Sequence, residues 1–516
     1  MKRLYISAIL LMVVNCAFAA TTFETVTLPN PQSEKVVVKM MFSNGSMSDP
    51  IGMEGMTQLT ASLMLEGGTG KYSATDIKSM TYPWAARWYS TVDKEVTVFT
   101  FEFHKDHAEQ MLSIMTGLVI APAFSESDYK RIKSNQENYI NEVIRSSSDE
   151  DLSKYALESF LFRDTRYAHP VGGTTQGLVN ISLEEVIRYH KSHFTARNLM
   201  LGIAGAYTDP YLLKLQDMMM KLPDTSPVSV KPVVARNPKG LQVEIITKQN
   251  TLGSAIFAGF PLEITRSQDE FAALMVANSW LGEHRKSYSR LYQKIREQRS
   301  MNYGDYTYIE WYENGGSNML PQPGYPRKTN YFSVWLRPVQ TAGALKSQYP
   351  ELKDIKIGHA HFAMRMALRE LQAMVDQGMT QEDFELTRDF LRSYTKLYIQ
   401  TPAKQLGFLM DSRFYGRNDF ISDLDVLLER LTLDDVNMAI RKFWQSKNMF
   451  ISIVTDKTEA EPLKESLMNG FRSPMSYSDA LRATLSPEIL AEDEEVSSYP
   501  MQASSVEIIS DQSLFR

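Results

Sequence analysis

Closely spaced histidines are the side chains in this sequence best suited to hold a metal ion. The chain has eight histidines, and three pairs are close in sequence: His104 with His107, His190 with His193, and His359 with His361. A hydrolytic zinc site also needs a glutamate beside its histidines, because a base must take a proton from the metal-bound water. None of the three pairs has a glutamate at the position that a hydrolytic motif requires. The histidines alone therefore predict no metal-dependent hydrolase.

Other catalytic chemistries also lack their signatures. The one cysteine, Cys16, lies near the N-terminus, so a processed chain would have no thiol for a disulfide, a metal site or a nucleophile. Lipidation of Cys16 is an alternative, although Asn15 is an unfavourable residue in front of a lipidated cysteine. The sequence contains no Gly-rich phosphate loop and no Gly-x-Ser-x-Gly elbow. The net charge of −6 argues against a nucleic-acid-binding protein, which usually carries a basic face.

The first twenty residues have the pattern of a secretory signal peptide. Lys2 and Arg3 precede an apolar run over residues 4–14, and Ala-Phe-Ala follows as a small-x-small cleavage signal. We therefore predict a signal peptide at residues 1–19 and an exported protein, periplasmic or, as the alternative, secreted. No later stretch reaches the roughly 20 apolar residues of a transmembrane helix, so we expect no membrane span.

An internal repeat organises the rest of the chain. Residues 182–199 match residues 432–449 at an offset of 250, with a helix cap, a helix, an aromatic residue, an asparagine and an apolar run in the same order. The apolar runs predict buried strands. Strands mixed with helices in two similar halves indicate the α+β class. The capping-box pairs that open the two helices are Ser182 with Glu185 and Thr432 with Asp435.

The repeat also bears on one histidine pair. His190 and His193 could share a face of the predicted helix, but Ile440 and Phe443 stand at the equivalent positions of the second copy. Because apolar residues replace both histidines there, we interpret His190 and His193 as packing residues.

Changes in composition mark the boundaries between the halves. The stretch 223–240 carries four prolines and few large apolar residues, so we place a linker at residues 226–245. An N-terminal domain then covers residues 20–225, and a C-terminal domain covers residues 246–470.

Two further segments stand outside this plan. Residues 313–328 contain two adjacent glycines and a proline-rich run, and we interpret them as a surface insertion or a lid. Residues 471–516 are polar and acidic, and we expect an ordered but peripheral tail.

The segment 55–69 resembles the helix that carries the inverted zinc motif H-x-x-E-H in insulinase/pitrilysin peptidases, especially in their mitochondrial-processing-peptidase-like branch. The resemblance covers residues 25 to 470. It implies two homologous peptidase-like halves, each a mixed sheet with helices, arranged as a clamshell around an unfolded peptide. Further landmarks follow in the family's order: His169-Pro170, Gly173-Thr174, Phe194, Asn198, Ser289-Arg290-Leu291 and Ile295-Arg296-Glu297.

The zinc motif itself is lost under this resemblance. Gln58 and Ser62 occupy the two histidine positions, and Ala61 occupies the position of the general base. Alanine cannot transfer a proton, and neutral amide or hydroxyl oxygens are poor substitutes for imidazole. We therefore expect this chain to bind no zinc. Glu142 resembles the family's distal glutamate and is the one retained ligand-like position, with a solvated helix carboxylate as the alternative.

A second pair of residues resembles the family's substrate-binding machinery. Arg296 and Tyr303 match an Arg/Tyr pair that reaches across the clamshell to the substrate carbonyl. A guanidinium and a phenol can donate hydrogen bonds to a developing oxyanion. The alternative is an exposed helix residue and a strand-face core residue. Ser300 and Asn302 stand where the family usually has glycine and alanine, so the local turn is in doubt.

The resemblance suggests a non-catalytic subunit of an exported heterodimeric zinc peptidase. Such a subunit would contribute half of a peptide-binding chamber and the Arg/Tyr pair, and zinc would be held only by a zinc-bearing homologous partner. We expect an unfolded peptide to bind as an added strand at a sheet edge. The alternatives are a scaffold or peptide-binding protein with no role in proteolysis, and an autonomous peptidase with an unrecognised site.

Overall fold

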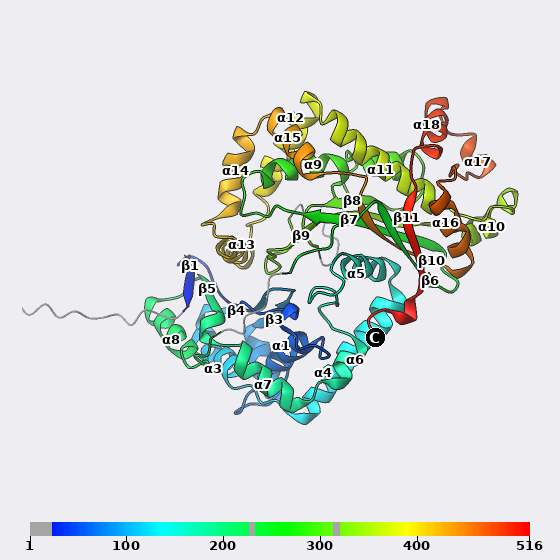
Figure 1. The fold of residues 1–516 in the computed structure, drawn as a ribbon. Helices are drawn as coiled ribbons and strands as arrows, with labels where there is room; N and C mark the ends of the chain where they lie inside the picture. The colour runs from blue at the N-terminus through cyan, green and yellow to red at the C-terminus, as the bar shows by residue number, and fades with distance from the viewer. Residues whose placement is uncertain (1–22, 227–232, 313–319) are drawn as a thin grey trace, which may run out of the picture.

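Two sheets, each with its own helices, form the two halves of the molecule (Figure 1). The computed structural model describes residues 23–226, 233–312 and 320–516. The predicted signal peptide, residues 1–19, lies outside these residues. Within them, none of the helices is both long and apolar enough to cross a membrane.

The first half is built on a five-stranded sheet with the order β1-β5-β2-β4-β3. β1 runs parallel to β5, and the other neighbours are antiparallel. The strands are β1 (Glu24–Pro29), β2 (Lys35–Phe42), β3 (Arg87–Val92), β4 (Thr97–His104) and β5 (Leu199–Gly205). The helices are α1 (Met56–Glu66), α2 (Ala74–Thr81), α3 (Ala108–Ile120), α4 (Glu126–Asn138), α5 (Asp149–Leu161), α6 (Thr175–Asn180), α7 (Leu183–His193) and α8 (Asp209–Met219).

The second half is built on a six-stranded sheet with the order β11-β6-β10-β7-β9-β8. β6 runs parallel to both β10 and β11, and the other neighbours are antiparallel. The strands are β6 (Leu241–Lys248), β7 (Gly253–Leu262), β8 (Asp305–Tyr308), β9 (Asn330–Gln340), β10 (Met449–Asp456) and β11 (Ala503–Ser510). The helices are α9 (Phe271–Gly282), α10 (Ala342–Gln348), α11 (Ala360–Gln377), α12 (Gln381–Thr395), α13 (Pro402–Phe414), α14 (Phe420–Arg430), α15 (Leu433–Phe443), α16 (Lys457–Asn469), α17 (Asp479–Arg482) and α18 (Pro487–Ser497).

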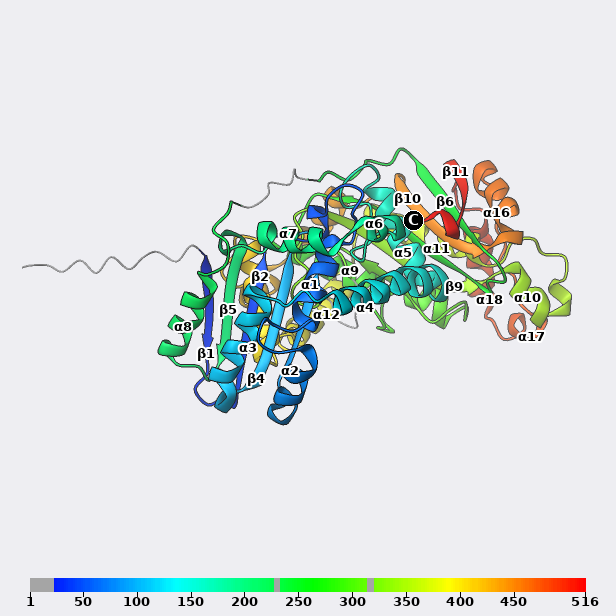
Figure 2. The ribbon, with the colours of Figure 1, turned by 90° about the horizontal axis from the view of Figure 1, so that it is seen from below.

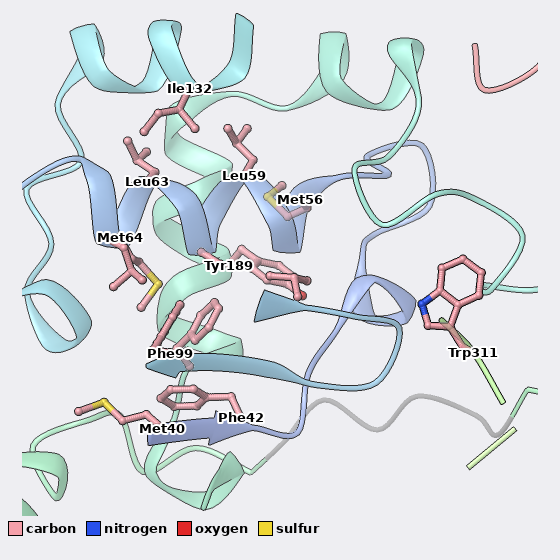
Figure 3. Packing of buried hydrophobic residues seen from close by; sticks show 14 of the residues in the cluster. Met40, Phe42, Met56, Leu59, Leu63, Met64, Phe99, Ile132, Tyr189 and Trp311 are labelled. Atoms are coloured by element: carbon pink, nitrogen blue, oxygen red, sulfur yellow. The ribbon is translucent and has the colours of Figure 1, made fainter. Parts of the chain in front are cut away.

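The main core of the first half lies between the sheet and helix α1. Strand side chains point to alternate faces, so every second residue of β2 faces this core. Figure 3 shows Met40 and Phe42 of β2 with Phe99 of β4, packed below Leu59 and Leu63 of α1. All five side chains are buried. This packing fixes α1 on the sheet and therefore sets the positions of its remaining residues.

The structure confirms the internal repeat. Ser182 and Glu185 form a reciprocal capping box at the start of α7, and Thr432 and Asp435 form the same arrangement at the start of α15. The apolar runs that follow are the central strands β5 and β10. The mixed α and β composition and the two-halved plan are as the sequence predicts.

His190 and His193 are packing residues, as the repeat indicated. A ring nitrogen of His190 lies 2.9 Å from the carbonyl oxygen of Val119. The ring of His193 stacks on Tyr189 with the centroids 3.8 Å apart. Burial lowers the pKa of both histidines, which keeps their rings neutral.

One helix of each half packs on the sheet of the other half. α13 of the second half packs on the face of the first sheet opposite α1, where Leu406 and Met410 meet Val37 and Met41. Gly202 of β5 makes this approach possible, since a Cβ there would lie 2.4 Å from the Met410 sulfur. Reciprocally, α5 of the first half packs on β7 and β10. In Figure 1, α13 lies above β1 and β5 of the first sheet, and α5 lies below the second sheet.

Two expected boundaries differ from the structure. β6 begins at Leu241, inside the predicted linker 226–245, because its apolar residues are buried in the second core. Residues 471–516 are not a peripheral tail, since β11 completes the second sheet beside β6. The acidic run of this segment is also anchored, with Asp493 2.7 Å from the buried guanidinium of Arg299.

The expected surface insertion or lid over residues 313–328 is also corrected in part. Residues 313–319 lie outside the described residues. Residues 320–328 run between the halves, and Arg327 is only 5% exposed. The Arg327 guanidinium lies 2.5 Å from Asp93 and 2.5 Å from Glu158, two buried carboxylates of the first half. Because this buried cation of the second half is paired with carboxylates of the first half, the segment is a contact between the halves.

Candidate functional site

A cavity of about 910 Å³ lies between the two halves. Its wall in the first half comes from α1, from strands β2, β3 and β4, and from the end of α4. The second half closes it with the segment after residue 320 and with the start of α13. Side chains on its wall include Lys39, Gln58, Ser62, Tyr139, Pro323 and Tyr325.

Gln58 and Ser62 face this cavity from neighbouring turns of α1. The Gln58 Nε2 donates a hydrogen bond to the Ser62 Oγ at 2.9 Å, since residues four apart lie on one helical face. Ala61 lies between them in sequence, and its side chain is fully buried. The structure therefore places two of the three motif positions on the cavity wall and turns the third into the core.

The start of α1 is held by a buried carboxylate. The Asp49 side chain accepts hydrogen bonds from the Gly55 N–H at 2.7 Å and from the Thr57 N–H at 2.8 Å. The Thr57 hydroxyl adds a third at 2.6 Å. Burial raises the pKa of Asp49 to about 7, and these hydrogen bonds act in the opposite direction. Asp49 thus satisfies free backbone donors of the helix that carries Gln58 and Ser62.

These residues do not fit zinc. Gln58 and Ser62 bind each other, and Ala61 offers no polar atom. Among the residues that the structure describes, no group of three or more His, Cys, Asp or Glu side chains could hold a metal ion. A zinc site needs three strong protein ligands, and these three positions do not supply them.

Glu142, the expected distal ligand, does not join the motif positions. It lies in a π-helical turn, Tyr139–Ser147, that follows α4, and it is exposed. Asn135, Gln136 and Tyr139 line the cavity instead. Their helical spacing on the face that meets α1 could have identified them from the sequence. The π-helical turn could not be foreseen, and its wider winding changes which side chains face inward.

Arg296 and Tyr303 also lie away from the cavity wall. Arg296 is in a second π-helical turn, Tyr292–Glu297, and its guanidinium lies 4.6 Å from the centroid of the Tyr292 ring. Tyr303 is 77% exposed, so it is not a core residue on a strand face. Ser300 between them has a positive φ of 52°, a backbone change at the turn that the sequence left in doubt. The structure does not bring this pair to Gln58 and Ser62.

The free edge of β3 runs along the cavity. β3 is an edge strand, and β4 is its one partner among the described residues. A second cavity of about 710 Å³ adjoins the first, and the wall residues that the two share are Gln58, Ser62, Glu66, Arg87, Tyr89 and Ser90. An open strand edge carries unpaired backbone donors and acceptors, which can pair with an added strand. The arrangement can therefore take an extended peptide.

The comparisons with known families agree with this architecture. The family model described as Insulinase (Peptidase family M16) matches residues 24–175. The model described as Peptidase M16 inactive domain matches residues 180–391. The chain belongs to peptidase family M16. It is a member that lacks the zinc motif, which confirms the resemblance seen in its sequence.

Relatives within the M16 family differ in what their names state. The chain is 20% identical over 469 residues to "Non-peptidase homolog YmxG" of Helicobacter pylori, covering 89% of this chain and 99% of that protein. It is 21% identical over 290 residues to "Uncharacterized zinc protease YmxG" of Bacillus subtilis, covering 56% of this chain and 68% of that protein.

Solved structures share the two-halved fold of this M16 chain. The crystal structure of a peptidase M16 inactive domain from Pseudomonas fluorescens matches with a TM-score of 0.71 at 17% identity, over 84% of this chain and 96% of that one. A protease from Helicobacter pylori matches with a TM-score of 0.69 at 11% identity, over 84% and 98%. At these identities the similarity shows the fold alone.

Proposed function

We propose that this chain is the non-catalytic subunit of an exported, two-chain zinc peptidase and contributes half of its peptide-binding chamber. One observation carries the proposal: a cavity of about 910 Å³ lies beside Gln58 and Ser62, which stand at the positions of the family's zinc ligands. A site without use would be free to close with larger apolar side chains, because protein interiors favour close packing. Retained space without hydrolytic groups fits a chamber whose metal lies elsewhere.

In this proposal an unfolded peptide binds along the open edge of β3. The backbone of the peptide pairs with the strand, and its alternate side chains enter the two adjoining cavities. Arg87 is held on this edge by Glu102, with both carboxylate oxygens 2.8 Å from one guanidinium nitrogen. Main-chain pairing gives affinity for many sequences, which suits a peptide chamber.

Arg296 and Tyr303 act on the partner in this proposal. Tyr303 is exposed, and neither residue lines the cavity of its own chain. A zinc-bearing homologous subunit would supply the metal and the general base, and this pair would donate hydrogen bonds to the oxyanion formed there. Loss of one such donor typically costs roughly 3–4 kcal/mol in the transition state.

The proposed partner subunit and the proposed export are supported by different observations. Two further relatives carry the names "Mitochondrial-processing peptidase subunit beta" of Neurospora crassa and "Cytochrome b-c1 complex subunit 1, mitochondrial" of Caenorhabditis elegans, and both names describe subunits. The signal-peptide pattern of residues 1–19 supports export, with the periplasm as the destination.

The test is a cleavage assay with the full mature chain, alone and mixed with zinc-bearing M16 homologues from the same cell. We expect an unfolded reporter peptide to be cleaved only in a mixture, and a chelator to abolish cleavage. Arg296→Ala or Tyr303→Phe should lower the rate about 100-fold or more, following the typical loss of one oxyanion donor. Arg482→Ala, at an exposed position of α17, is the matched control.

Two results would contradict this proposal. Unchanged cleavage in the Arg296 and Tyr303 variants would remove their role. Cleavage by the purified chain alone, with stoichiometric zinc, would replace the subunit proposal with an autonomous peptidase.

A scaffold or peptide-binding protein without proteolysis is the second candidate. The buried pairing of Arg327 with Asp93 and Glu158 favours it, because this contact holds the halves together. The name "Non-peptidase homolog" of the Helicobacter pylori relative points the same way. A stable complex that cleaves no peptide, with any zinc-bearing homologue, would favour this candidate over the subunit of a peptidase.

A further inference from the structure

Lys39 of β2 is a buried lysine on the wall of the cavity. The residue is 4% exposed, and its Nζ donates one hydrogen bond, to the Thr100 Oγ1 at 2.9 Å. Among the described residues, no carboxylate oxygen lies within 4.0 Å of the Lys39 Nζ, so Lys39 forms no ion pair there. An ammonium has three donors, so this hydrogen bond leaves two of them for other partners. Buried lysines are normally paired, which makes Lys39 an exception.

The charged groups around Lys39 are already engaged. Glu102 is held by Arg87, and Asp411 of α13 accepts a hydrogen bond from the Gly324 N–H at 3.0 Å. Burial lowers the pKa of Lys39 to about 8, and the more distant charges of Asp411 and Glu102 oppose this effect. Lys39 is therefore still a cation at neutral pH. Glu66 and Lys404 are the other charged residues on the cavity wall.

The position of the Lys39 side chain is fixed by α13. A Cβ at Gly407 would lie 3.4 Å from the Lys39 Cε and 2.6 Å from the Pro323 Cβ. The glycine therefore leaves room for the lysine stem beside Pro323. A rigid stem holds the ammonium in place, which lowers the entropy lost when it binds a ligand.

Lys39 also lies within reach of a peptide on β3. In the strand register, Tyr89 of β3 is opposite Thr100 of β4, and Thr100 is opposite Lys39 of β2. These three residues form a row across one face of the sheet, about 10 Å long at the usual strand spacing. A peptide strand on the edge of β3 would lie one strand spacing farther out, so about four extended residues that turn inward would reach Lys39.

We propose that Lys39 is a carboxylate-binding residue of the chamber, which holds the C-terminal carboxylate or an acidic side chain of the bound peptide. This inference rests on the proposed peptide-binding function and names the chemistry that the chamber selects. A carboxylate would accept the hydrogen bonds that Thr100 does not take. The ligand class is therefore an extended peptide with an acidic group about four residues beyond the segment paired with β3.

The test measures the affinity of three fluorescent ten-residue peptides for the full chain by anisotropy. The first peptide has a free C-terminal carboxylate and no acidic side chain, the second is its C-terminal amide, and the third is the amide with one internal glutamate. We expect the free acid to bind the unmodified chain at least about tenfold more tightly than the amide, as for a hydrogen bond to a charged group. If the third peptide matches the free acid, an acidic side chain is the source of the carboxylate.

Two lysine variants complete the experiment. In Lys39→Met the acid should lose at least about tenfold in affinity, while the amide should bind as before. Lys346→Met, at an exposed position of α10 that does not line the cavity, is the matched control and should leave the preference for the acid intact. The comparison of acid with amide on the unmodified chain does not depend on how either variant folds.

Each negative result has a distinct meaning. Equal affinities of all three peptides for the unmodified chain would overturn the role of Lys39 and leave the peptide chamber standing. An equal loss for acid and amide in Lys39→Met would do the same. Failure of every peptide to bind the unmodified chain would overturn the chamber as well.

Discussion

The two sheets meet the opposite half at equivalent places, but only one of these places holds a large cavity. Lys39 is opposite Gly202 across β2 and β5, and Phe257 is opposite Ser452 across β7 and β10. Gly202 and Ser452 are equivalent in the repeat, so Lys39 and Phe257 are equivalent too. The cavity at Lys39 measures about 910 Å³ and the cavity at Phe257 about 140 Å³.

Aromatic side chains account for the smaller space. Phe257, Tyr306 and Trp335 line the cavity of the second half, together with Lys154 from α5. The Lys154 ammonium lies 3.1 Å from Asp151 and 5.6 Å from the centroid of the Trp335 ring. At this second cavity the buried lysine of α5 is thus paired within its own helix, and aromatic side chains of the second half fill the space around it. The first half leaves both the lysine and the space open, which is the pattern of a binding site.

The largest expected effect comes from the buried ion pairs of Arg327 that join the two halves. Replacing Arg327 by Met leaves Asp93 and the cluster around Glu158 short of a buried cation. Removal of one partner of a buried pair costs about 3–5 kcal/mol. Urea unfolding of the full chain at neutral pH would measure this loss of stability.

The matched variant is Arg337→Met at the second cavity. Arg337 lies 2.8 Å from Glu150, and both side chains are about one third exposed, at 32% and 34%. Solvent weakens such a pair, so its loss should cost less than about 1 kcal/mol. Equal costs at Arg327 and Arg337 would contradict the distinction between the two sites.

The next largest effect is expected from Asp411, whose titration should make the stability of the chain depend on pH. Burial raises the pKa of this α13 carboxyl from 3.8 to about 7. The folded state therefore holds the proton more tightly than the unfolded state, and stability should fall as pH rises from about 4 to about 7. This difference in pKa corresponds to a change on the order of 4 kcal/mol. Asp49 contributes in the same direction because its pKa is also raised to about 7.

Asp411→Asn is expected to remove the Asp411 share of this pH dependence. The amide oxygen can still accept the hydrogen bond from Gly324, so the contact is kept at every pH. Unfolding measured at pH 5 and pH 8 should then differ less for the variant than for the unmodified chain. An unchanged difference would show that Asp411 is not the titrating group.

A smaller effect is expected where α13 crosses the first sheet. Gly202→Ala places a Cβ against the Met410 sulfur, at 2.4 Å before any relaxation. Overpacking of this kind typically costs about 1–3 kcal/mol. Thermal unfolding would detect the loss, and a variant as stable as the unmodified chain would mean that α13 is free to move.

The smallest effect is expected where α5 crosses the second sheet. The Ser153 hydroxyl donates to the Ser452 carbonyl oxygen at 3.0 Å. Ser153→Ala removes this hydrogen bond and should cost about 1 kcal/mol. If Ser153→Ala lost more stability than Gly202→Ala in the same thermal-unfolding assay, the predicted order of the two effects would be wrong.

The sequence predicts the fold and the lost motif well because local rules decide both. The capping boxes at Ser182 and Thr432 depend on residues three apart. The shared face of Gln58 and Ser62 follows from the helical repeat and needs no tertiary contact. The family models confirm the family to which these patterns pointed.

The rest of the site depends on contacts that local rules do not describe. Pro323 and Tyr325 line the cavity although more than 200 positions separate them from Gln58. Glu142 faces away because a π-helical turn alters the spacing after α4. The position of Tyr303 follows from the backbone at Ser300, where a non-glycine residue has a positive φ.

The packing of α5 and α13 on the sheets of the opposite halves suggests how such a chain could arise. Neither sheet is covered on both faces by its own residues, so a half made alone would expose apolar surface. A single half could cover that surface in a domain-swapped homodimer, in which each copy places its α5-like helix on the sheet of the other copy. The present chain has the plan of such a homodimer joined end to end, after which the two copies were free to diverge in what they enclose.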